Sequence, residues 1–159
     1  MEGGTGSRSL DKDMPDELPD RLEAGTQNTC GIAGLLEGIR FVMNRGEENI
    51  GKYEKSLIEL LASRLDGLNK VKCYFAGNKE LQGGVLSFVV EGMECETIGQ
   101  LLGQRGAAVR SGLHCAPLAH KSAGTVETGT IRVSVSAFNK QMEIARFVSV
   151  LEDVVRRGI

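Results

Sequence analysis

The residues best suited to chemistry lie close together in the second half of the chain. Arg110, His114 and Cys115 fall within six positions, in a segment that also carries Gly112 and Pro117. Cationic neighbours favour the thiolate form of a cysteine, which is the reactive nucleophile, and a loop can present it to a partner. The alternative is that His114 and Cys115 simply pack beneath the loop, because an isolated His-Cys pair is a weak signal.

A second candidate is Arg132, which lies early in a short apolar run that reads as a strand. An arginine in such a strand must pair with an acid or face a cleft, because burying an unpaired guanidinium is costly. Its planar fork matches a carboxylate through two parallel hydrogen bonds. A structural salt bridge to Glu127 or another acidic residue is the alternative interpretation.

A third candidate segment, RLEAGTQNT over residues 21–29, directly precedes the first predicted helix. Its Thr and Asn residues are of the types that cap helix N-termini, where a side-chain oxygen accepts a hydrogen bond from a backbone N–H group. The same N–H groups also suit an anionic ligand. Capping alone and ligand binding therefore both stay open for Asn28.

Composition and charge exclude several classes of protein. The 159 residues include 19 Lys and Arg against 21 Asp and Glu, a net charge of -2, which argues against nucleic-acid or polybasic membrane-surface binding. No run approaches the ~20 apolar residues of a membrane span, and the N-terminus does not read as a secretion signal. The spacing of the four cysteines matches no zinc template, so we expect no metal site, reduced thiols and a cytoplasmic location.

Apolar periodicity predicts a small α+β domain over residues 31–159, preceded by an extended segment over residues 1–30. The predicted helices are 31–45, 47–65, 94–104 and 141–156. The predicted strands are 71–75, 85–90, 107–110 and 131–136, and residues 111–129 are expected to form a long loop. This order favours a sheet of about four strands with helices packed on one face.

Taken in order, three segments resemble the class V aminotransferase family, and in particular its cysteine desulfurase branch. They are residues 21–29, the string VRSGLHCAPL over 109–118, and IRVS over 131–134 followed by Phe138-Asn139. The opening GGTG at 3–6 resembles the glycine-rich turn of the same family. The resemblance covers nearly the whole chain. It implies the small C-terminal domain of a fold-type I enzyme that uses pyridoxal phosphate (PLP), with residues 1–30 as a remnant of the large PLP-binding domain.

The resemblance also implies roles for individual residues. Cys115 matches the cysteine that attacks the substrate sulfur and becomes a persulfide, and thiolates are suited to sulfur transfer. Arg132 matches the residue that binds the substrate carboxylate. Arg110 matches a residue near the active cysteine, and Asn28 lies in the stretch that borders the substrate.

Partners and cofactor follow from the same resemblance. Gly4 and Thr5 match a turn that reaches across a homodimer to the PLP phosphate of the partner subunit. The implied substrate is L-cysteine or a related amino acid, and the implied partner is a sulfur-acceptor protein of the kind that serves iron–sulfur cluster assembly. We expect PLP only in the full-length enzyme, and the chain alone to hold none and to be inactive. A selenocysteine lyase or another family member, and a non-enzymatic domain that accepts sulfur or binds a partner, are the alternatives.

We predict that the chain alone does not bind PLP covalently. Lys121 follows a histidine, as the Schiff-base lysine of the family does, but it lies directly after the Cys115 segment, whereas the family lysine belongs to the domain that precedes this segment. Mixing the chain with PLP should therefore give no stable visible absorption band of a lysine adduct. A band that appears and is then lost in the Lys121→Ala variant would contradict this expectation.

Overall fold

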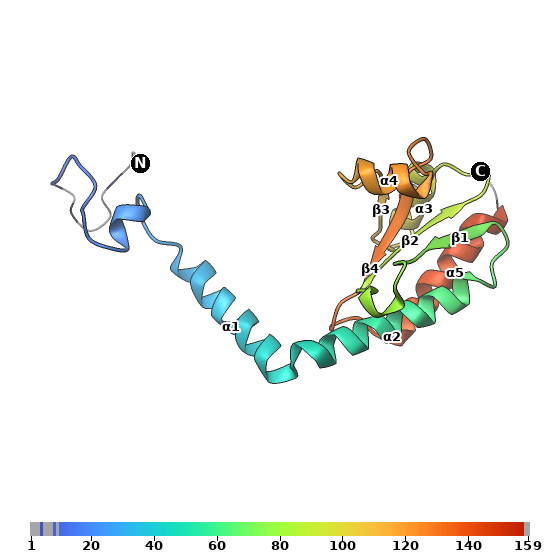
Figure 1. The fold of residues 1–159 in the computed structure, drawn as a ribbon, viewed down its shortest axis with the longest axis horizontal. Coiled ribbons are helices and arrows are strands. Elements are labelled where there is room, and N and C mark those ends of the chain that lie inside the picture. The colour runs from blue at the N-terminus through green and yellow to red at the C-terminus, as the bar shows by residue number, and fades with distance from the viewer. Residues whose placement is uncertain (1–3, 5–7, 9, 158–159) are drawn as a thin grey trace. The chain divides into compact units, whose positions relative to one another are not determined.

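The computed structural model describes residues 4, 8 and 10–157. The chain divides into two compact units, Met1–Arg45 and Gly46–Ile159 (Figure 1). The domain boundary predicted between residues 30 and 31 falls near the start of a helix inside the first unit, and it stays a prediction.

The N-terminal unit contains a 3-10 turn, η1 (Asp20–Leu22), and the helix α1 (Thr29–Arg45). Asn28 caps this helix, because its Oδ1 accepts a hydrogen bond of 3.0 Å from the Gly31 N–H group. None of the α1 side chains is buried. The apolar stripe that predicts this helix is exposed along its length, at Ile32, Leu35, Leu36, Ile39, Val42 and Met43.

The C-terminal unit is built on a four-stranded antiparallel sheet with the strand order β1-β2-β4-β3. Its strands are β1 (Val71–Tyr74), β2 (Val85–Val90), β3 (Arg110–Gly112) and β4 (Thr130–Ser134). Its helices are α2 (Glu47–Leu65), α3 (Cys95–Gln104), α4 (Pro117–Ala123) and α5 (Gln141–Arg157), with a 3-10 turn, η2, at Lys79–Leu81. The predicted α+β class and the number of strands are confirmed.

The register of the sheet decides which side chains face the core. Ser87 of β2 lies opposite Arg132 of β4, and Arg132 lies opposite Arg110 of β3. Residues that lie opposite one another share a face of the sheet, and successive residues alternate between faces. Arg110, Ser87 and Arg132 therefore share one face, while Ile131 and Val133 turn to the other face and are buried.

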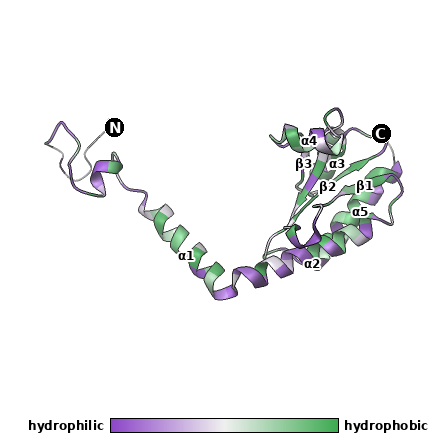
Figure 2. Ribbon diagram, in the orientation of Figure 1, coloured by the Kyte–Doolittle hydropathy of each residue, from purple (hydrophilic) through white to green (hydrophobic). Residues whose placement is uncertain are grey.

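Helices α2, α3 and α5 pack on the face that carries Ile131 and Val133. Phe88 of β2 is fully buried there and packs edge-on against the ring of Phe147, with the ring centroids 6.4 Å apart. In Figure 2, α2 and α5 each carry both hydrophobic and hydrophilic residues, as helices with one buried side do. Among the described residues, no helix combines the length and the apolar character that crossing a membrane requires.

The segment 111–129, expected to be a long loop, contains two elements that the sequence analysis did not identify. Strand β3 spans Arg110–Gly112, whereas the prediction placed this strand over residues 107–110, and α4 spans Pro117–Ala123. Pro117 fits the first turn of a helix, and Gly124 ends α4 in the left-handed region with a φ of 68°. A helix of seven residues is too short to show a periodic apolar stripe, so the glycine and proline content favoured a loop.

We predict that Phe88→Ala lowers the free energy of unfolding of the C-terminal unit by about 3–5 kcal/mol, because it removes a fully buried ring and leaves a cavity. Urea unfolding followed by circular dichroism measures this. Leu118→Ala is the matched control, because Leu118 is 78% exposed on α4 and its truncation is expected to cost less than about 0.5 kcal/mol. Equal effects of the two substitutions would show that this face of the sheet is not the core.

Candidate functional site

Cys115 lies exposed in the turn that joins β3 to α4. His114 and Cys115 have φ values of 52° and 57°, in the left-handed region that residues other than glycine rarely adopt. The Ala116 N–H group donates a hydrogen bond of 2.9 Å to the Leu113 carbonyl and closes the turn. Left-handed residues of this kind concentrate at functional sites, where the surrounding structure must hold them.

The His114 ring folds back toward β3, where its Nε2 lies 3.1 Å from the Arg110 carbonyl oxygen. Since a carbonyl oxygen only accepts, Nε2 is the protonated nitrogen of the neutral ring. Burial lowers the pKa of His114 below its ordinary value of 6.5, and the neighbouring Arg132, His120 and Arg110 side chains lower it further, although the hydrogen bond to the Arg110 carbonyl raises it. The ring is therefore neutral at pH 7.

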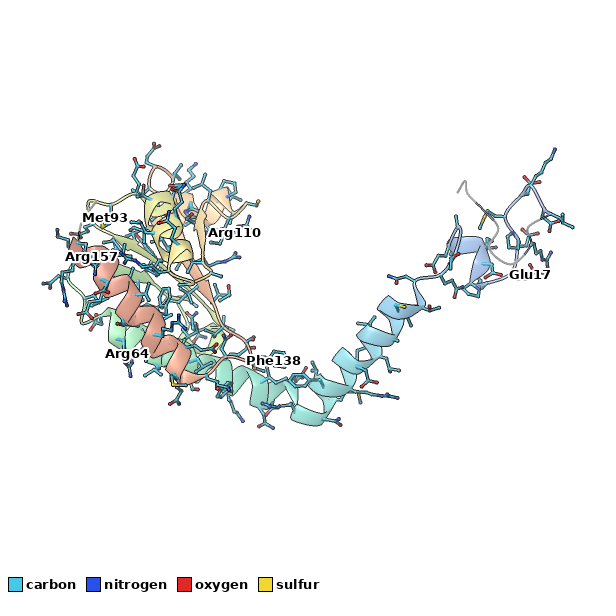
Figure 3. The ribbon with its side chains drawn as sticks, turned by 180° about the vertical axis from the view of Figure 1, so that it is seen from behind. Glu17, Arg64, Met93, Arg110, Phe138 and Arg157 are labelled. Atoms are coloured by element: carbon cyan, nitrogen blue, oxygen red, sulfur yellow. The ribbon has the colours of Figure 1, made fainter. Side chains whose placement is uncertain are left out.

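Arg132 lies half-buried on the sheet face that the three large helices leave open. Its Nε is buried and has no hydrogen-bond partner among the described residues. Arg110 lies directly opposite it in the register, and like charges in this position repel each other (Figure 3 labels Arg110). The alternative salt bridge from Arg132 to Glu127 does not form in the described part of the chain. An anion such as a carboxylate suits this pair of guanidinium groups.

Helix α4 covers part of the same open face. A pocket of about 140 Å³ is lined there by Tyr74, Ser87 and Thr130 of the sheet together with His120 and Thr125. Because Ser87 also lies opposite Arg132 in the register, this pocket adjoins the part of the sheet that carries Arg132 and Arg110. The sequence analysis did not identify His120 or Thr125 as site residues. The available signal was a histidine four residues before Gly124, and this signal can be interpreted only once α4 is known to end at that glycine.

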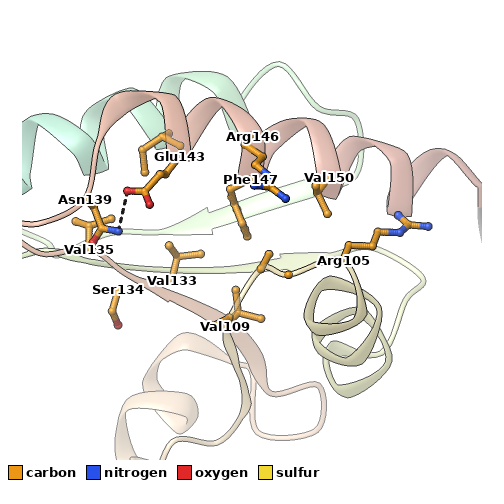
Figure 4. A pocket seen from close by; sticks show the side chains of 14 residues that line it. Arg105, Val109, Val133, Ser134, Val135, Asn139, Glu143, Arg146, Phe147 and Val150 are labelled. Carbon is orange, nitrogen blue, oxygen red and sulfur yellow. Dashed lines mark hydrogen bonds between the residues drawn. The ribbon is translucent and has the colours of Figure 1, made fainter.

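A larger pocket, of about 330 Å³, lies between β4, the segment 106–109 and α5 (Figure 4). Asn139 and Glu143 at its wall are joined by a hydrogen bond of 3.3 Å. Cys115, Arg110 and Arg132 do not line it. Arg110 and Arg132 therefore lie on the open face, and Cys115 lies in the turn after β3, outside this pocket.

The remaining predicted site residues belong to the N-terminal unit. Asn28 makes the capping hydrogen bond to α1, so its structural role is confirmed, and a role toward substrate stays a prediction. The Gly4 carbonyl accepts a hydrogen bond of 2.7 Å from the Gly25 N–H group, and nothing lies within 4 Å of where a side chain at Gly4 would begin. Thr5 lies outside the described residues.

The four cysteines differ sharply in environment, and none forms a disulfide. Burial, with a smaller contribution from Asp66, raises the pKa of Cys73 to about 11. Burial and the hydrogen bond that its thiol donates to Glu96, at 3.1 Å, raise the pKa of Cys95. Cys30 and Cys115 are exposed. The helix-start position of Cys95, which by itself favours a thiolate, is thus outweighed by burial.

Comparison with known proteins shows the class of protein directly. The chain belongs to the class-V aminotransferase family, whose model matches residues 1–147. It is 33% identical over 150 residues to a probable cysteine desulfurase of Mycolicibacterium paratuberculosis. The aligned region covers 94% of this chain and 21% of that protein. The structure of a cysteine desulfurase from Thermococcus onnurineus, solved in the apo state, is 34% identical and has a TM-score of 0.79, over 99% of this chain and 39% of that one. The resemblance inferred from the sequence is confirmed.

The chain spans only part of the proteins it resembles, namely 21% of the Mycolicibacterium paratuberculosis protein and 34% of a probable cysteine desulfurase of Pyrococcus abyssi. Family members bind PLP. One structure that shares the fold, a variant of the protein C-DES, holds glycine covalently linked to its PLP cofactor; it is 21% identical, with a TM-score of 0.68 over 96% of this chain and 37% of that one. The match is therefore to a fragment of a cysteine desulfurase-like protein.

We predict that alkylation at neutral pH labels Cys115 first and leaves Cys73 and Cys95 unmodified in the folded chain. The two protected thiols are buried in part or in full and have raised pKa values. Cys30 is exposed and is the rival, but no arginine or histidine lies within six positions of it in the sequence, whereas Arg110 and His114 precede Cys115 closely. Limited labelling with iodoacetamide and peptide mass spectrometry measures the order. Labelling of Cys30 ahead of Cys115 would remove the chemical argument for the reactive turn.

Proposed function

We propose that this chain is the C-terminal part of a PLP-dependent cysteine desulfurase-like enzyme, which converts L-cysteine to L-alanine and leaves the sulfur as a persulfide on Cys115. The observation that supports this most is an exposed thiol in a left-handed turn that follows β3, the strand in which Arg110 lies opposite Arg132. The chain also shares 34% identity and its fold with a cysteine desulfurase over 99% of its length.

Arg132 is the residue that would bind the carboxylate of the substrate. Its guanidinium presents a buried Nε that no protein acceptor satisfies among the described residues, and a carboxylate supplies two acceptor oxygens in matching geometry. Arg110, directly opposite, would add a second positive charge that favours an anionic ligand. Asn28 would border the substrate from the N-terminal segment.

Cys115 would then act as the nucleophile. Its thiolate attacks the sulfur atom of the substrate, a new S–S bond forms, and the carbon–sulfur bond of the substrate breaks. The electron pair of that bond stays on the carbon, which takes up a proton, so that L-cysteine and a thiol become L-alanine and a persulfide. PLP, when bound, supplies the electron sink for this bond cleavage. The proposed task of the Cys115 turn is to reach the substrate sulfur and later to hand the persulfide to an acceptor protein.

The fit to PLP rests on the N-terminal unit. We propose that Gly4 and Thr5 contact the PLP phosphate of a partner subunit in a homodimer; the open space around Gly4 is compatible with a close approach of this kind. The exposed apolar stripe of α1 supports a covered position in the full protein, against the large PLP domain or a second copy. We further propose that the chain alone is inactive. Its four free thiols are consistent with a reducing, cytoplasmic location.

Two alternatives use the same surface differently. A selenocysteine lyase would keep Arg132 as the carboxylate site and act on selenium instead of sulfur. A non-enzymatic sulfur acceptor would use Cys115 without any amino-acid substrate. The thiol on the exposed turn favours desulfuration over the first alternative, and the unpartnered Nε of Arg132 favours a carboxylate substrate over the second.

The test joins this chain to the large domain of the Thermococcus onnurineus relative and measures alanine formation from L-cysteine. We expect Cys115→Ala to lower kcat at least about a hundredfold, because the nucleophile is removed. Arg132→Lys is expected to raise KM about tenfold, because the ammonium group cannot bind a carboxylate in the forked geometry.

Cys30→Ala is the matched control, since Cys30 is an equally exposed thiol in the other unit, and it should leave kcat unchanged. Mass spectrometry after turnover should find the additional sulfur on Cys115. Full activity of Cys115→Ala, or a persulfide on Cys30 instead, would contradict the proposed role. Preference for selenocysteine with little alanine formed from cysteine would favour the lyase.

A further inference from the structure

The C-terminal unit buries a histidine that the proposed chemistry does not use. His120 of α4 is 6% exposed, and Thr125, just after this helix, is 2% exposed. The His120 Nδ1 lies 2.8 Å from the Thr125 hydroxyl oxygen and 3.3 Å from the Thr125 carbonyl oxygen. Because a carbonyl oxygen only accepts, a proton on Nδ1 serves both contacts and sets the orientation of the ring.

The backbone ties the same two residues together again. The Thr125 N–H group donates a hydrogen bond of 2.9 Å to the His120 carbonyl, directly after the left-handed Gly124 that ends α4. His120 and Thr125 also line the small pocket against Tyr74, Ser87 and Thr130 of the sheet. The orientation of the His120 ring is therefore set by Thr125 in the segment that follows its helix, next to a pocket that the sheet also lines.

On its other side, the His120 ring meets the ring of His114. The ring centroids lie 5.8 Å apart, with an angle of 48° between the planes. The His114 ring in turn donates from Nε2 to the Arg110 carbonyl, at 3.1 Å. A continuous series of contacts thus runs from Thr125 through His120 and His114 to the strand that precedes Cys115.

We propose that His120, anchored by Thr125, is a positioning residue that holds the His114 ring and thereby the left-handed turn that presents the Cys115 thiol. This inference rests on the proposed function of Cys115, and it assigns no chemical step to His120. His114 and Cys115 are two successive residues other than glycine in the left-handed region, which is energetically costly, so the turn needs support from its surroundings. The ring of His114 is the part of the turn that these contacts hold.

A residue that only filled space at position 120 would be apolar. A buried imidazole needs its nitrogen satisfied and carries a desolvation cost that leucine or phenylalanine would avoid. Thr125 is buried with it and supplies that partner. The polar pair is explained if a fixed ring orientation is required next to His114, whose cationic neighbours are Arg110 and Arg132.

The test compares Thr125→Val, which removes the hydroxyl group at nearly constant volume, with Thr125→Ser, which keeps it. In Thr125→Val we expect the nitrogen NMR signals of the His114 ring to lose the pattern of a single Nε2-protonated tautomer. We also expect alkylation of Cys115 by iodoacetamide to slow roughly tenfold, because misplacement of a reacting group carries a cost of this order. Thr125→Ser should restore the single tautomer of His114 and an alkylation rate of Cys115 within about twofold of that of the parent chain.

Lys121→Ala is the control on α4, because Lys121 is exposed beside His120 and should change neither readout. A His114 tautomer and a Cys115 rate that stay unchanged in a folded Thr125→Val variant overturn the proposal. If that variant does not fold, His120→Asn replaces it, because this substitution keeps a donor toward Thr125 and removes the ring. We expect it to lose the single His114 tautomer and to slow the alkylation of Cys115. The absence of both effects overturns the proposal. Neither readout requires sulfur transfer, so a failure of the desulfurase proposal would be seen separately, as missing persulfide on a normally reactive Cys115.

Discussion

The alternation of side chains along β4 is the constraint on which the rest of the C-terminal unit depends. Ile131 and Val133 enter the core beneath α2, α3 and α5, and this requires Arg132 to face the other side of the sheet. A shift of the register by one residue would bury the guanidinium and expose the two aliphatic side chains. The hydrophobic core therefore fixes the direction of the Arg132 side chain. The alternation of side chains along β4 thus serves both the stability of the unit and the proposed function.

The same face explains why a short helix and a strained turn can exist there. Helix α4 has seven residues, too few to be stable alone, and His120 is its buried side chain. Its stability must come from its surroundings, where His120 and Thr125 bond to each other and line one pocket together with Tyr74, Ser87 and Thr130 of the sheet. The turn before α4 depends on this docking in the same way, because α4 is where the turn ends.

The long elements could be predicted from the sequence because their apolar pattern repeats, over several turns in a helix and over several alternating residues in a strand. The bounds predicted for α2 and β2 agree with the structure, and those of α1 and α5 differ by one or two residues. Helix α4 could not be predicted, because its main packing residue is a histidine and its ends are the proline and glycine that are typical of loops. The environment of His120 is formed by Thr125, five positions later, and by residues of β1, β2 and β4. Neighbours so far apart in the chain produce no local pattern in the sequence.

The position of Arg132 carries an energetic argument that separates the functional classes. A buried guanidinium nitrogen without an acceptor costs about 1–3 kcal/mol or more, and Arg110 lies directly opposite and adds repulsion. A domain selected only for folding or for accepting sulfur on Cys115 gains nothing from this arrangement, because a leucine or threonine would suit the open face better. A carboxylate offsets both costs at once by accepting the hydrogen bond and neutralising the charge. The unpartnered Arg132 Nε is thus the feature of the sheet that supports the proposed amino-acid substrate most directly.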